Sequence, residues 1–338
     1  MTDVQQMPVT AIDVPTTSAP RERVSTPTPH RKPAPPRVDS RDPRYLALRN
    51  FAMSMSVFNI LGYTVLGFEQ PWTWPLFALA VGYTVEIVVE LIAARSERRP
   101  PGFTGNGFWG MYTFLLPTHI TALAANMLLY ANTDFWPIAF AVAVAVGQKA
   151  VLQAPINNRM RHFMNPSNFG ITMTLLLFSW VNVAPPYHFT EHVPDVIRIV
   201  VPVVIITAGT VLNGMLTKKV PLIVGWVGAF VIQAVIRHFV WDVAIWAALG
   251  PMTGVAFVLF TNYMITDPGT TPTNGRMQFM FGAGVGTVYG ILLFFNVVYT
   301  LFFAVTIVCL LRGGYHWWKT LSQRRRERPH IAAHQVVR

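Results

Sequence analysis

The feature that most constrains this chain is a succession of apolar segments, each near the roughly 20 residues that cross about 30 Å of hydrocarbon. Ten such segments begin near Tyr45, Trp72, Phe108, Phe135, Asn168, Val196, Val220, Val243, Gln278 and Val297. Charged residues make up only 12% of the chain, against roughly 25% in ordinary soluble domains. The pattern predicts an all-α integral membrane protein with about ten transmembrane helices.

Lysine and arginine side chains fall almost entirely on one side of these segments. They follow the even-numbered segments, at Arg95, Arg98, Arg99, Lys149, Arg159, Arg161, Lys218, Lys219, Arg276, Arg312, Lys319 and residues 324–326. Cations near helix ends are retained on the cytoplasmic side of a membrane. We therefore expect a multi-pass protein of the cell membrane with both termini in the cytoplasm. The net charge of +11 then reflects topology and contact with anionic membrane lipids, and calls for no nucleic acid.

Both ends of the chain are polar and basic. Residues 1–41 are rich in Pro, Thr, Ser and Arg, a composition that buries too little apolar surface to offset the entropy of ordering. We predict a disordered cytoplasmic tail there, and no cleaved signal peptide, since no apolar core directly follows a charged start. Residues 42–315 would form the ten-helix domain, and residues 316–338 a basic cytoplasmic tail. The single cysteine, Cys309, lies in the last span and is expected to pack in the interior.

A short internal similarity links the third and eighth segments. Residues 116–122 read LPTHITA and residues 250–256 read GPMTGVA. The two stretches share a Pro, a Thr and small residues, and they lie five spans apart. An odd number of spans per half would invert one half relative to the other, and inverted repeats place binding sites at the repeat interface. Two inverted five-helix repeats are one hypothesis that the sequence allows.

Ionisable groups within the spans are expensive in hydrocarbon and usually face a cavity or a partner. Glu86 and Glu90 lie four residues apart on one face of the second helix. They either hold protons or pair with Lys149, or they reach the cytoplasmic boundary and pair with Arg95. His119 follows Pro117, and it would relay protons, contact a ring, or donate to a carbonyl freed by that proline.

Amide side chains in the spans are Asn126, Asn213, Gln233 and Asn262. Their first interpretation is interhelical hydrogen bonding, the usual role of amides in a membrane bundle. Gln233 and Arg237 are four residues apart, and as a pair they would anchor the outer end of the seventh helix.

The sequence contains no glycine-rich phosphate loop, no His-Glu-x-x-His and no Cys-x-x-Cys, and it identifies no catalytic residue. His188 and His192 flank Glu191 on an outer loop. With no third close ligand, a solvated loop is favoured over a metal site, and we predict no bound metal.

A polar, turn-forming loop lies between the eighth and ninth apolar segments. It reads TDPGTTPTNGR over residues 266–276. A polar loop so placed can hold a hydrophilic ligand at the membrane surface. Asp267-Pro268-Gly269 and Asn274-Gly275 are also ordinary turn formers, so a purely structural loop is the alternative.

Three stretches together resemble the RnfD/NqrB family, the flavin-carrying membrane subunits of bacterial electron-transport complexes. Residues 147–149 (GQK) are similar to the family's Gly-Lys segment, residues 163–170 (FMNPSNFG) to its Phe-Asn-Pro-Ala motif, and residues 264–276 to its Met-Ala-Thr-Asp-Pro loop and the Asn-Lys-Gly after it. They follow the family's order over about 130 residues. The resemblance implies a helical bundle like that of an inverted-repeat transporter, and electron transfer through a flavin.

One departure concerns how a flavin would be attached. The family links FMN to the Thr of a Ser-Gly-Ala-Thr motif located between the second and third of these stretches, and residues 171–263 contain no such motif. Any FMN or riboflavin is therefore expected to bind non-covalently. The Pro- and Arg-rich tail and the missing motif make the chain more similar to the UnbU-type membrane proteins of enediyne antibiotic biosynthesis.

The resemblance implies a membrane redox protein that transfers electrons through a flavin bound between its halves. The implied cofactor-binding residues are Lys149, Asn165, Thr266, Asp267, Thr270 and Asn274. Lys149 would neutralise a phosphate or a reduced flavin; Asp267 would fix the loop or handle a proton; the other four would supply hydrogen bonds. A redox partner protein and a hydrophobic small-molecule substrate are expected. The alternatives are a transporter exporting a biosynthetic product and a membrane scaffold that docks soluble enzymes through the tails.

Overall fold

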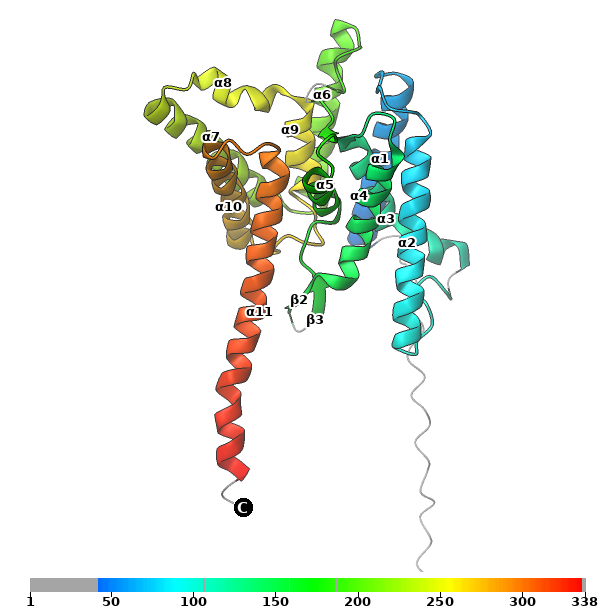
Figure 1. The fold of residues 1–338 in the computed structure, drawn as a ribbon, viewed down its shortest axis with the longest axis vertical. Helices are drawn as coiled ribbons and strands as arrows, with labels where there is room; N and C mark the ends of the chain where they lie inside the picture. The colour runs from blue at the N-terminus through cyan, green and yellow to red at the C-terminus, as the bar shows by residue number, and fades with distance from the viewer. Residues whose placement is uncertain (1–41, 106, 158, 186–187, 336–338) are drawn as a thin grey trace, which may run out of the picture. The chain divides into compact units, whose positions relative to one another are not determined.

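The computed structural model describes residues 42–105, 107–157, 159–185 and 188–335, so the predicted disordered tail of residues 1–41 lies outside the described residues. The described chain is mostly helical (Figure 1). Its first half contains α1 (Pro43–Thr64), α2 (Trp74–Ser96), α3 (Gly107–Leu128), α4 (Phe135–Val151) and α5 (Pro166–Leu177). Its second half contains α6 (Asp195–Val211), η1 (Leu212–Leu216), α7 (Val220–Trp241), α8 (Ile245–Leu249), η2 (Gly250–Thr253), α9 (Val255–Leu259), η3 (Phe260–Met264), α10 (Gly275–Phe294) and α11 (Thr300–Gln335).

Ten helical segments thus begin close to the ten predicted positions, but they are not ten equivalent spans. Among the described residues, five helices are long and apolar enough to cross a membrane: Trp74–Ser96, Asp195–Leu216, Val220–Trp241, Gly275–Phe294 and Thr300–Gln323. A sixth candidate is the pair Ile245–Thr253 and Val255–Met264, which is bent by 67°. Helix α5 has only 12 residues, or about 18 Å at 1.5 Å per residue. A mostly helical protein with five or six candidate spans is what the fold supports; ten spans are not confirmed.

The proposed internal repeat is not confirmed either. Pro117 lies inside the continuous helix α3, whereas Pro251 lies in the 3-10 turn η2, where the chain bends. The two similar stretches therefore have different backbone structures. At the other end of the chain, α11 continues to Gln335, through most of the segment predicted as a basic tail.

Two small antiparallel sheets, which the sequence analysis did not predict, interrupt the helices. Strand β1 (Leu129–Tyr130) pairs with β4 (Asn182–Val183), and β2 (Gln153–Ile156) forms a hairpin with β3 (Arg159–His162). Asn157, at the hairpin turn, has a φ of 52°, which asparagine tolerates better than most residues. The hairpin carries Arg161 and His162 toward the start of α5.

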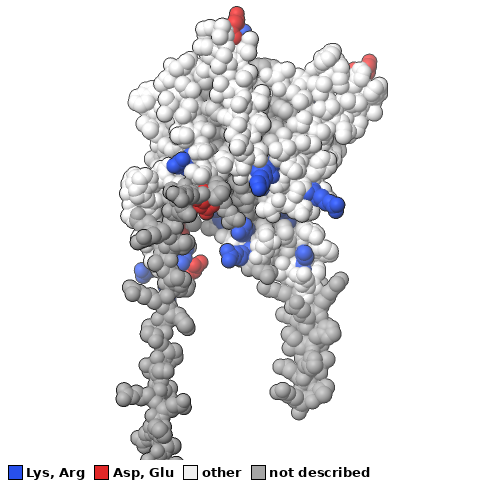
Figure 2. All heavy atoms as spheres, turned by 180° about the vertical axis from the view of Figure 1, so that it is seen from behind, with Lys and Arg blue, Asp and Glu red and all other residues white. Residues whose placement is uncertain are grey.

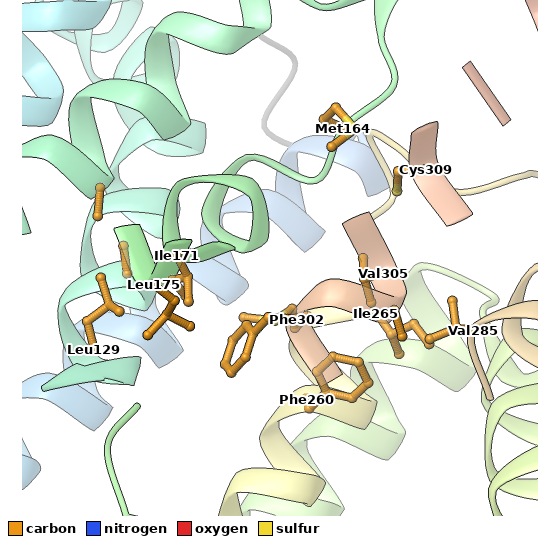
Figure 3. Packing of buried hydrophobic residues seen from close by; sticks show 14 of the residues in the cluster. Leu129, Met164, Ile171, Leu175, Phe260, Ile265, Val285, Phe302, Val305 and Cys309 are labelled. Atoms are coloured by element: carbon orange, nitrogen blue, oxygen red, sulfur yellow. The ribbon is translucent and has the colours of Figure 1, made fainter. Parts of the chain in front are cut away.

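The main hydrophobic core joins the two halves of the chain. Figure 3 shows Ile171 and Leu175 of α5 near Phe302 and Val305 of α11. Asn168 of α5 crosses the same contact, donating to the carbonyl of Phe302 at 2.9 Å and to the Thr306 hydroxyl at 2.8 Å. Cys309 is buried in this cluster, as expected. Helix α5 is therefore an internal helix, held by packing and amide hydrogen bonds.

Helices α7 and α10 make the most extensive contact between two helices in the described chain. Glycines allow their backbones to approach closely. A Cβ added at Gly282 would lie 2.1 Å from the carbonyl oxygen of Leu222, and one at Gly225 would lie 2.3 Å from that of Phe279. Small residues at such contacts are typical of helix pairs in membranes.

Charged side chains are distributed unevenly over the described surface. Figure 2 shows a broad area without charged side chains; most of the visible Lys and Arg side chains gather along its lower edge, together with some acidic ones, and a few charged side chains lie at the opposite end. The uncharged area is what a lipid-facing surface requires. This distribution matches the asymmetry of the loops in the sequence.

Candidate functional site

A cavity of about 560 Å³ lies where the two halves of the chain meet. This volume is within the range of small-molecule sites. The apolar part of its lining comes from α1 and α3, including Phe51, Met55, Ile120 and Met127, and is completed by Tyr263 of η3. The rings of Phe51 and Tyr263 are 5.5 Å apart. The cavity therefore offers an apolar, partly aromatic surface to one end of a ligand.

The other end of the cavity is polar and predominantly basic. Its lining includes the cations Lys149, Arg161 and Lys219, the imidazole of His162 and the carboxylate of Asp267. Burial lowers the pKa of His162, an effect that nearby Asp267 opposes. His162 is therefore neutral at pH 7. The charged groups of the lining are three cations and one carboxylate, and one of the cations, Lys149, is paired with Glu86 behind the wall.

Lys219 carries the strongest sign of an anionic ligand. It precedes α7 as the N-cap residue, is 3% exposed, and donates from Nζ to the carbonyl oxygen of Pro272 at 2.7 Å. Among the described residues, no carboxylate forms an ion pair with it. Burial lowers the pKa of Lys219 to about 8. Asp267, in the same lining, opposes this effect without forming an ion pair with Lys219. A buried cation that lacks a direct ion pair is costly, and an anion in the cavity would reduce that cost.

Lys149 reaches the same cavity from the last turn of α4. Its Nζ lies 2.5 Å from Oε2 of Glu86 in α2, and Thr118 of α3 donates to the same oxygen at 2.6 Å. The sequence left the partner of Lys149 open among Glu86, Glu90 and a ligand. The structure pairs it with Glu86, so that three helices hold the ammonium group in place at the cavity wall.

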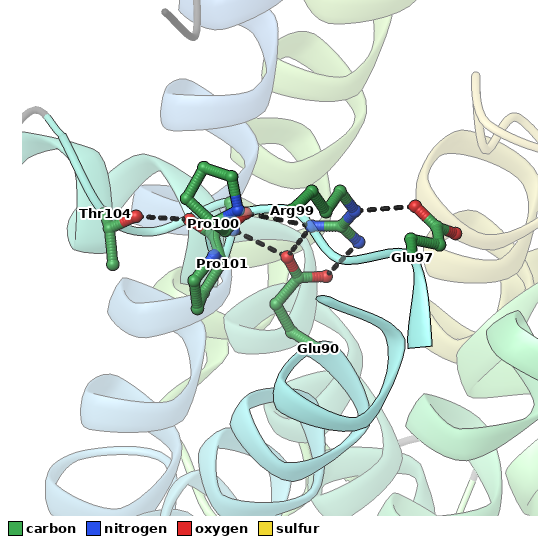
Figure 4. A network of polar contacts seen from close by, with 7 residues as sticks. Glu90, Glu97, Arg99, Pro100, Pro101 and Thr104 are labelled. Atoms are coloured by element: carbon green, nitrogen blue, oxygen red, sulfur yellow. Dashed lines mark hydrogen bonds and ion pairs between the residues drawn. The ribbon is translucent and has the colours of Figure 1, made fainter. Parts of the chain in front are cut away.

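Glu90 belongs to a separate cluster one turn further along α2. It pairs with Arg99, which also contacts Glu97, and its Oε1 accepts a hydrogen bond from the backbone N of Gly102 at 2.6 Å (Figure 4). The sequence had offered Arg95 as the boundary partner; the bend after α2 brings Arg99 back instead. These two carboxylates raise the pKa of Arg99. Glu90 does not line the cavity.

The polar loop after η3 is ordered by its own hydrogen bonds. Asp267 accepts from the backbone N of Gly269 at 3.1 Å and from the Thr270 hydroxyl at 2.6 Å. Arg312 of α11 donates to the Thr270 carbonyl. Asp267 therefore lines the cavity and also fixes the loop. Fixing the loop is the first of the two roles that the sequence analysis expected for it.

Asn165 and Thr266 line the cavity, but their hydrogen-bonding atoms are used within the protein. Asn165 caps α5 by accepting from Asn168 N at 3.0 Å and donates to the carbonyl of Met264 at 2.7 Å. Thr266 donates to the carbonyl of Asn262 at 2.7 Å. Both side chains shape the wall by joining η3 to its neighbours.

Four of the six predicted cofactor-binding residues, Lys149, Asn165, Thr266 and Asp267, therefore line one cavity. Thr270 is 1% exposed and lies behind Asp267, outside the lining. Asn274 is exposed and caps α10 by accepting from the backbone N of Arg276 and Met277. The neighbouring Thr273 lines the cavity in its place.

The sequence analysis missed three basic residues of the lining. Arg161, His162 and Lys219 had been interpreted as topology determinants or left without a role. The short connection between η1 and α7 was a usable signal for Lys219, because it places the lysine two residues before Pro221, at the start of a helix. The positions of Arg161 and His162 depend on the β2–β3 hairpin, which leaves no clear pattern in the sequence.

His119 bridges two hydroxyl groups instead of reaching a freed carbonyl. Its Nε2 lies 2.7 Å from the Ser56 hydroxyl in α1, and its Nδ1 lies 2.7 Å from the Tyr83 hydroxyl in α2. This chain of three side chains is one helical turn from Glu86, but none of its members lines the cavity.

The expected hydrogen bonds between helices form for two of the four amide side chains. Asn126 donates to Tyr63 at 3.0 Å, joining α3 to α1, and Asn213 donates to the carbonyl of Asn262 at 2.7 Å, joining η1 to η3. Asn262 itself donates within its own helical segment. The side-chain amide of Gln233 makes no hydrogen bond with any of the described residues.

The outer loop at His188 is not simply solvated. His188 is buried and stacks on Phe68 with ring centroids 3.6 Å apart, and burial lowers its pKa to about 4. His192 is half exposed beside Glu69. Within the described residues, no group of three potential metal ligands comes together.

No family model matches this chain, and no curated protein matches it significantly.

Proposed function

We propose that this chain is an RnfD/NqrB-like membrane redox protein of about ten spans, which binds a flavin non-covalently in the cavity and transfers electrons through it. The observation that carries the proposal is that one cavity collects Lys149, Asn165, Thr266 and Asp267, residues of three stretches that resemble the family. We propose further that the protein acts in the biosynthesis of an enediyne-type natural product, on the basis of its resemblance to UnbU-type proteins.

The residues of the cavity fit FMN better than riboflavin. Both flavins have a planar ring that suits the apolar surface near Phe51 and Tyr263. Only FMN carries a phosphate, which would compensate the charge of Lys219 and Arg161 at the basic end. A bound flavin would supply the electron transfer.

The protein's own groups would orient the ligand and set its electrostatic environment. Lys219 is positioned to neutralise a phosphate as a point charge. Lys149 is held at the wall by Glu86 and Thr118, and its ammonium group would be positioned beside the ligand although Glu86 offsets part of its charge. Asp267 holds the loop through its hydrogen bond with Thr270. The loop packs tightly against His162, because a Cβ added at Gly269 would lie only 3.3 Å from Nε2 of that histidine.

The test is purification in mild detergent followed by a visible spectrum and extraction of any chromophore. We expect a flavin that denaturation releases, because the attachment motif is missing. Protein purified without flavin should bind FMN more tightly than riboflavin in a fluorescence titration. Absence of flavin in the purified protein, together with no binding of either compound, would exclude the redox proposal. A flavin that stays on the chain in a denaturing gel would refute non-covalent binding.

Lys149→Met and Asp267→Asn test the site assignment. Each should weaken FMN binding while the purified protein remains folded, and the double variant should not restore binding. Glu90→Gln is the matched control, since Glu90 lies on α2 one turn from Glu86 and outside the cavity. If both single variants bound FMN with wild-type affinity, the assignment of Lys149 and Asp267 to the FMN site would be wrong.

The proposed orientation, with both termini in the cytoplasm, is supported by the basic edge seen in Figure 2. Cys309 is buried, so a cysteine introduced at Arg98 would be the accessible thiol among the described residues. We expect a membrane-impermeant reagent to label this position only in inverted vesicles or opened cells. Labelling in intact cells would contradict the proposed orientation and place this loop outside the cell.

A transporter is the second candidate, and the bend of 67° between the two halves of the eighth segment favours it. Discontinuous helices beside a cavity are common in secondary transporters. Flux of a substrate into proteoliposomes without any reductant would support this class over the redox class.

A further inference from the structure

A second cavity, of about 880 Å³, forms a groove along α7 and α10 and shares no lining residue with the first. Its floor consists of small residues, among them Gly228, Ala229 and Ala283. Large apolar side chains with substantial exposure line its sides, namely Ile232, Ile236, Trp241, Phe279, Ile291 and Phe294. Since α7 and α10 are both candidate membrane spans, the groove would be open to lipid.

Two polar groups without partners lie in this otherwise apolar groove. Gln233 is 8% exposed, and neither its amide nitrogen nor its amide oxygen has a hydrogen-bond partner among the described residues. Arg237 follows one helical turn later and forms no ion pair in the described part of the chain. Buried amides are normally satisfied, and a cation at a membrane span normally has a counter-charge or reaches the interface.

We propose that this groove is a binding site for an anionic membrane phospholipid. An acyl chain would lie along the small-residue floor, and the acidic headgroup would meet Arg237, with Gln233 hydrogen-bonding to an ester carbonyl. The inference does not depend on a flavin in the other cavity. Lys219 and Arg237 are 18 residues apart, or about 27 Å along α7, so the headgroup would lie at the membrane face opposite the first cavity.

Charge complementarity favours a lipid over the other possible occupants. A neutral chain would fill the apolar part but would leave Arg237 without a counter-charge. A transmembrane helix of another protein would need an acidic residue at the depth of Arg237. An anionic phospholipid supplies the acid and the chain in one molecule, and basic sites between membrane helices are known to hold such headgroups.

The experiment is a titration of delipidated full-length protein with phosphatidylglycerol and with phosphatidylcholine of the same acyl chains, followed by native mass spectrometry. We expect phosphatidylglycerol to bind more tightly. Arg237→Gln should weaken its binding about fivefold, as expected for loss of roughly 1 kcal/mol from one arginine near a headgroup. Arg198→Gln is the control, because Arg198 is a solvent-exposed basic residue that pairs with Asp195.

A steric variant tests the groove itself. A Cβ at Gly228 meets no atom within 4 Å, so Gly228→Leu should occupy the groove without disturbing the α7–α10 contact, and phosphatidylglycerol binding should be lost. Gly314→Leu, on α11 and with equal space, should leave binding unchanged. Thermal unfolding confirms that both variants are folded.

Equal binding of the two lipids would overturn the proposal. So would unchanged phosphatidylglycerol affinity in Arg237→Gln, or a second copy of the chain found in the groove by cross-linking at Phe279. If Gly228→Leu fails to fold, the comparison of Arg237→Gln with Arg198→Gln still decides the outcome.

Discussion

Helices α7 and α10 pack through glycines along uninterrupted helices, whereas η1 and η3, beside the first cavity, are π-helical and joined by an amide side chain. In the first region the backbone groups of the helix interiors bond within their own helices, so the contact requires only small residues. In the second, wider turns leave carbonyls such as those of Asn262 and Met264 to accept from Asn213, Asn165 and Thr266. Close packing stabilises the first region; polar side chains maintain the shape of the second.

The largest effect is expected from a methyl group added within the glycine contact. Gly282→Ala would place Cβ 2.1 Å from the Leu222 carbonyl oxygen, so the two backbones must separate. We expect a loss of about 3 kcal/mol in the free energy of unfolding, the upper end of overpacking costs. Unfolding in detergent measures it. Gly284→Ala, two residues away, meets no atom closer than 4.0 Å and should be neutral or slightly stabilising. Equal stabilities of the two variants would contradict the packing argument.

Asn165→Ala should cost about 2 kcal/mol. It removes a helix cap and leaves the buried Met264 carbonyl without its donor. Asn274→Ala removes a cap of the same kind from the exposed start of α10 and should cost about 1 kcal/mol. Because both variants lose a helix cap, the difference between their losses in the free energy of unfolding measures the hydrogen bond from Asn165 to the Met264 carbonyl in η3. No difference would mean that this amide does not stabilise the cavity wall.

Lys219→Met should separate stability from binding. Lys219 is buried and forms no direct ion pair among the described residues. Replacing such a buried charge with an apolar side chain is often neutral or stabilising, so the ligand-free protein should unfold at an equal or higher temperature. Its affinity for FMN should fall about tenfold, close to 1.4 kcal/mol, whereas riboflavin binding should change little. Lys218→Met, at the adjacent position outside the lining, is the control. Parallel loss of both ligands would argue against a phosphate contact.

The smallest expected effect is a pH dependence of FMN binding. The pKa of Lys219 is lowered to about 8 by burial, so the cation is present at pH 7 and mostly lost at pH 9. FMN affinity should therefore fall by about fivefold between these pH values, a change in which the phosphate, with a second pKa near 6, does not take part. In Lys219→Arg, where the charge persists, the affinity should be nearly constant. A profile equally steep in both proteins would assign the titration to another group.

The starts of the helical segments could be predicted from the sequence because apolar runs and polar interruptions act locally. The predicted starts at Phe135 and Val220 coincide with those of α4 and α7. Whether a segment crosses the membrane could not be predicted in the same way. The depth of α5 in the core depends on Asn168 meeting α11, more than 130 residues later. The bend between Thr253 and Val255 divides an apolar run that the sequence presents as continuous.

The site shows the same division between local and long-range information. Lys149 and Asp267 were predicted to share a site because each lies at the end of a helical segment beside a short polar motif, and both line the cavity; their role in binding a ligand stays a prediction. Arg161 and His162 could not, since a hairpin places them, and Lys219 was hidden among the other cations at helix ends. Thr270 and Asn274 share the loop motif with Asp267, yet their roles in the fold are to support the loop and to cap α10. Sequence motifs locate such a loop without distinguishing the residues that face the cavity.

The π-helical turn of η3 has a consequence for insertions and deletions. The backbone N of Ile265 bonds to the carbonyl of Phe260, five residues back, so the turn holds one residue more than an α-helix would place there. Deleting one residue between Phe260 and Met264 would let the helix close normally and would rotate everything after it by about 100°. The loop that starts at Thr266 would then leave the cavity wall, although every residue of its motif was intact. The length of η3 therefore positions the cavity wall independently of the identity of the residues that follow it.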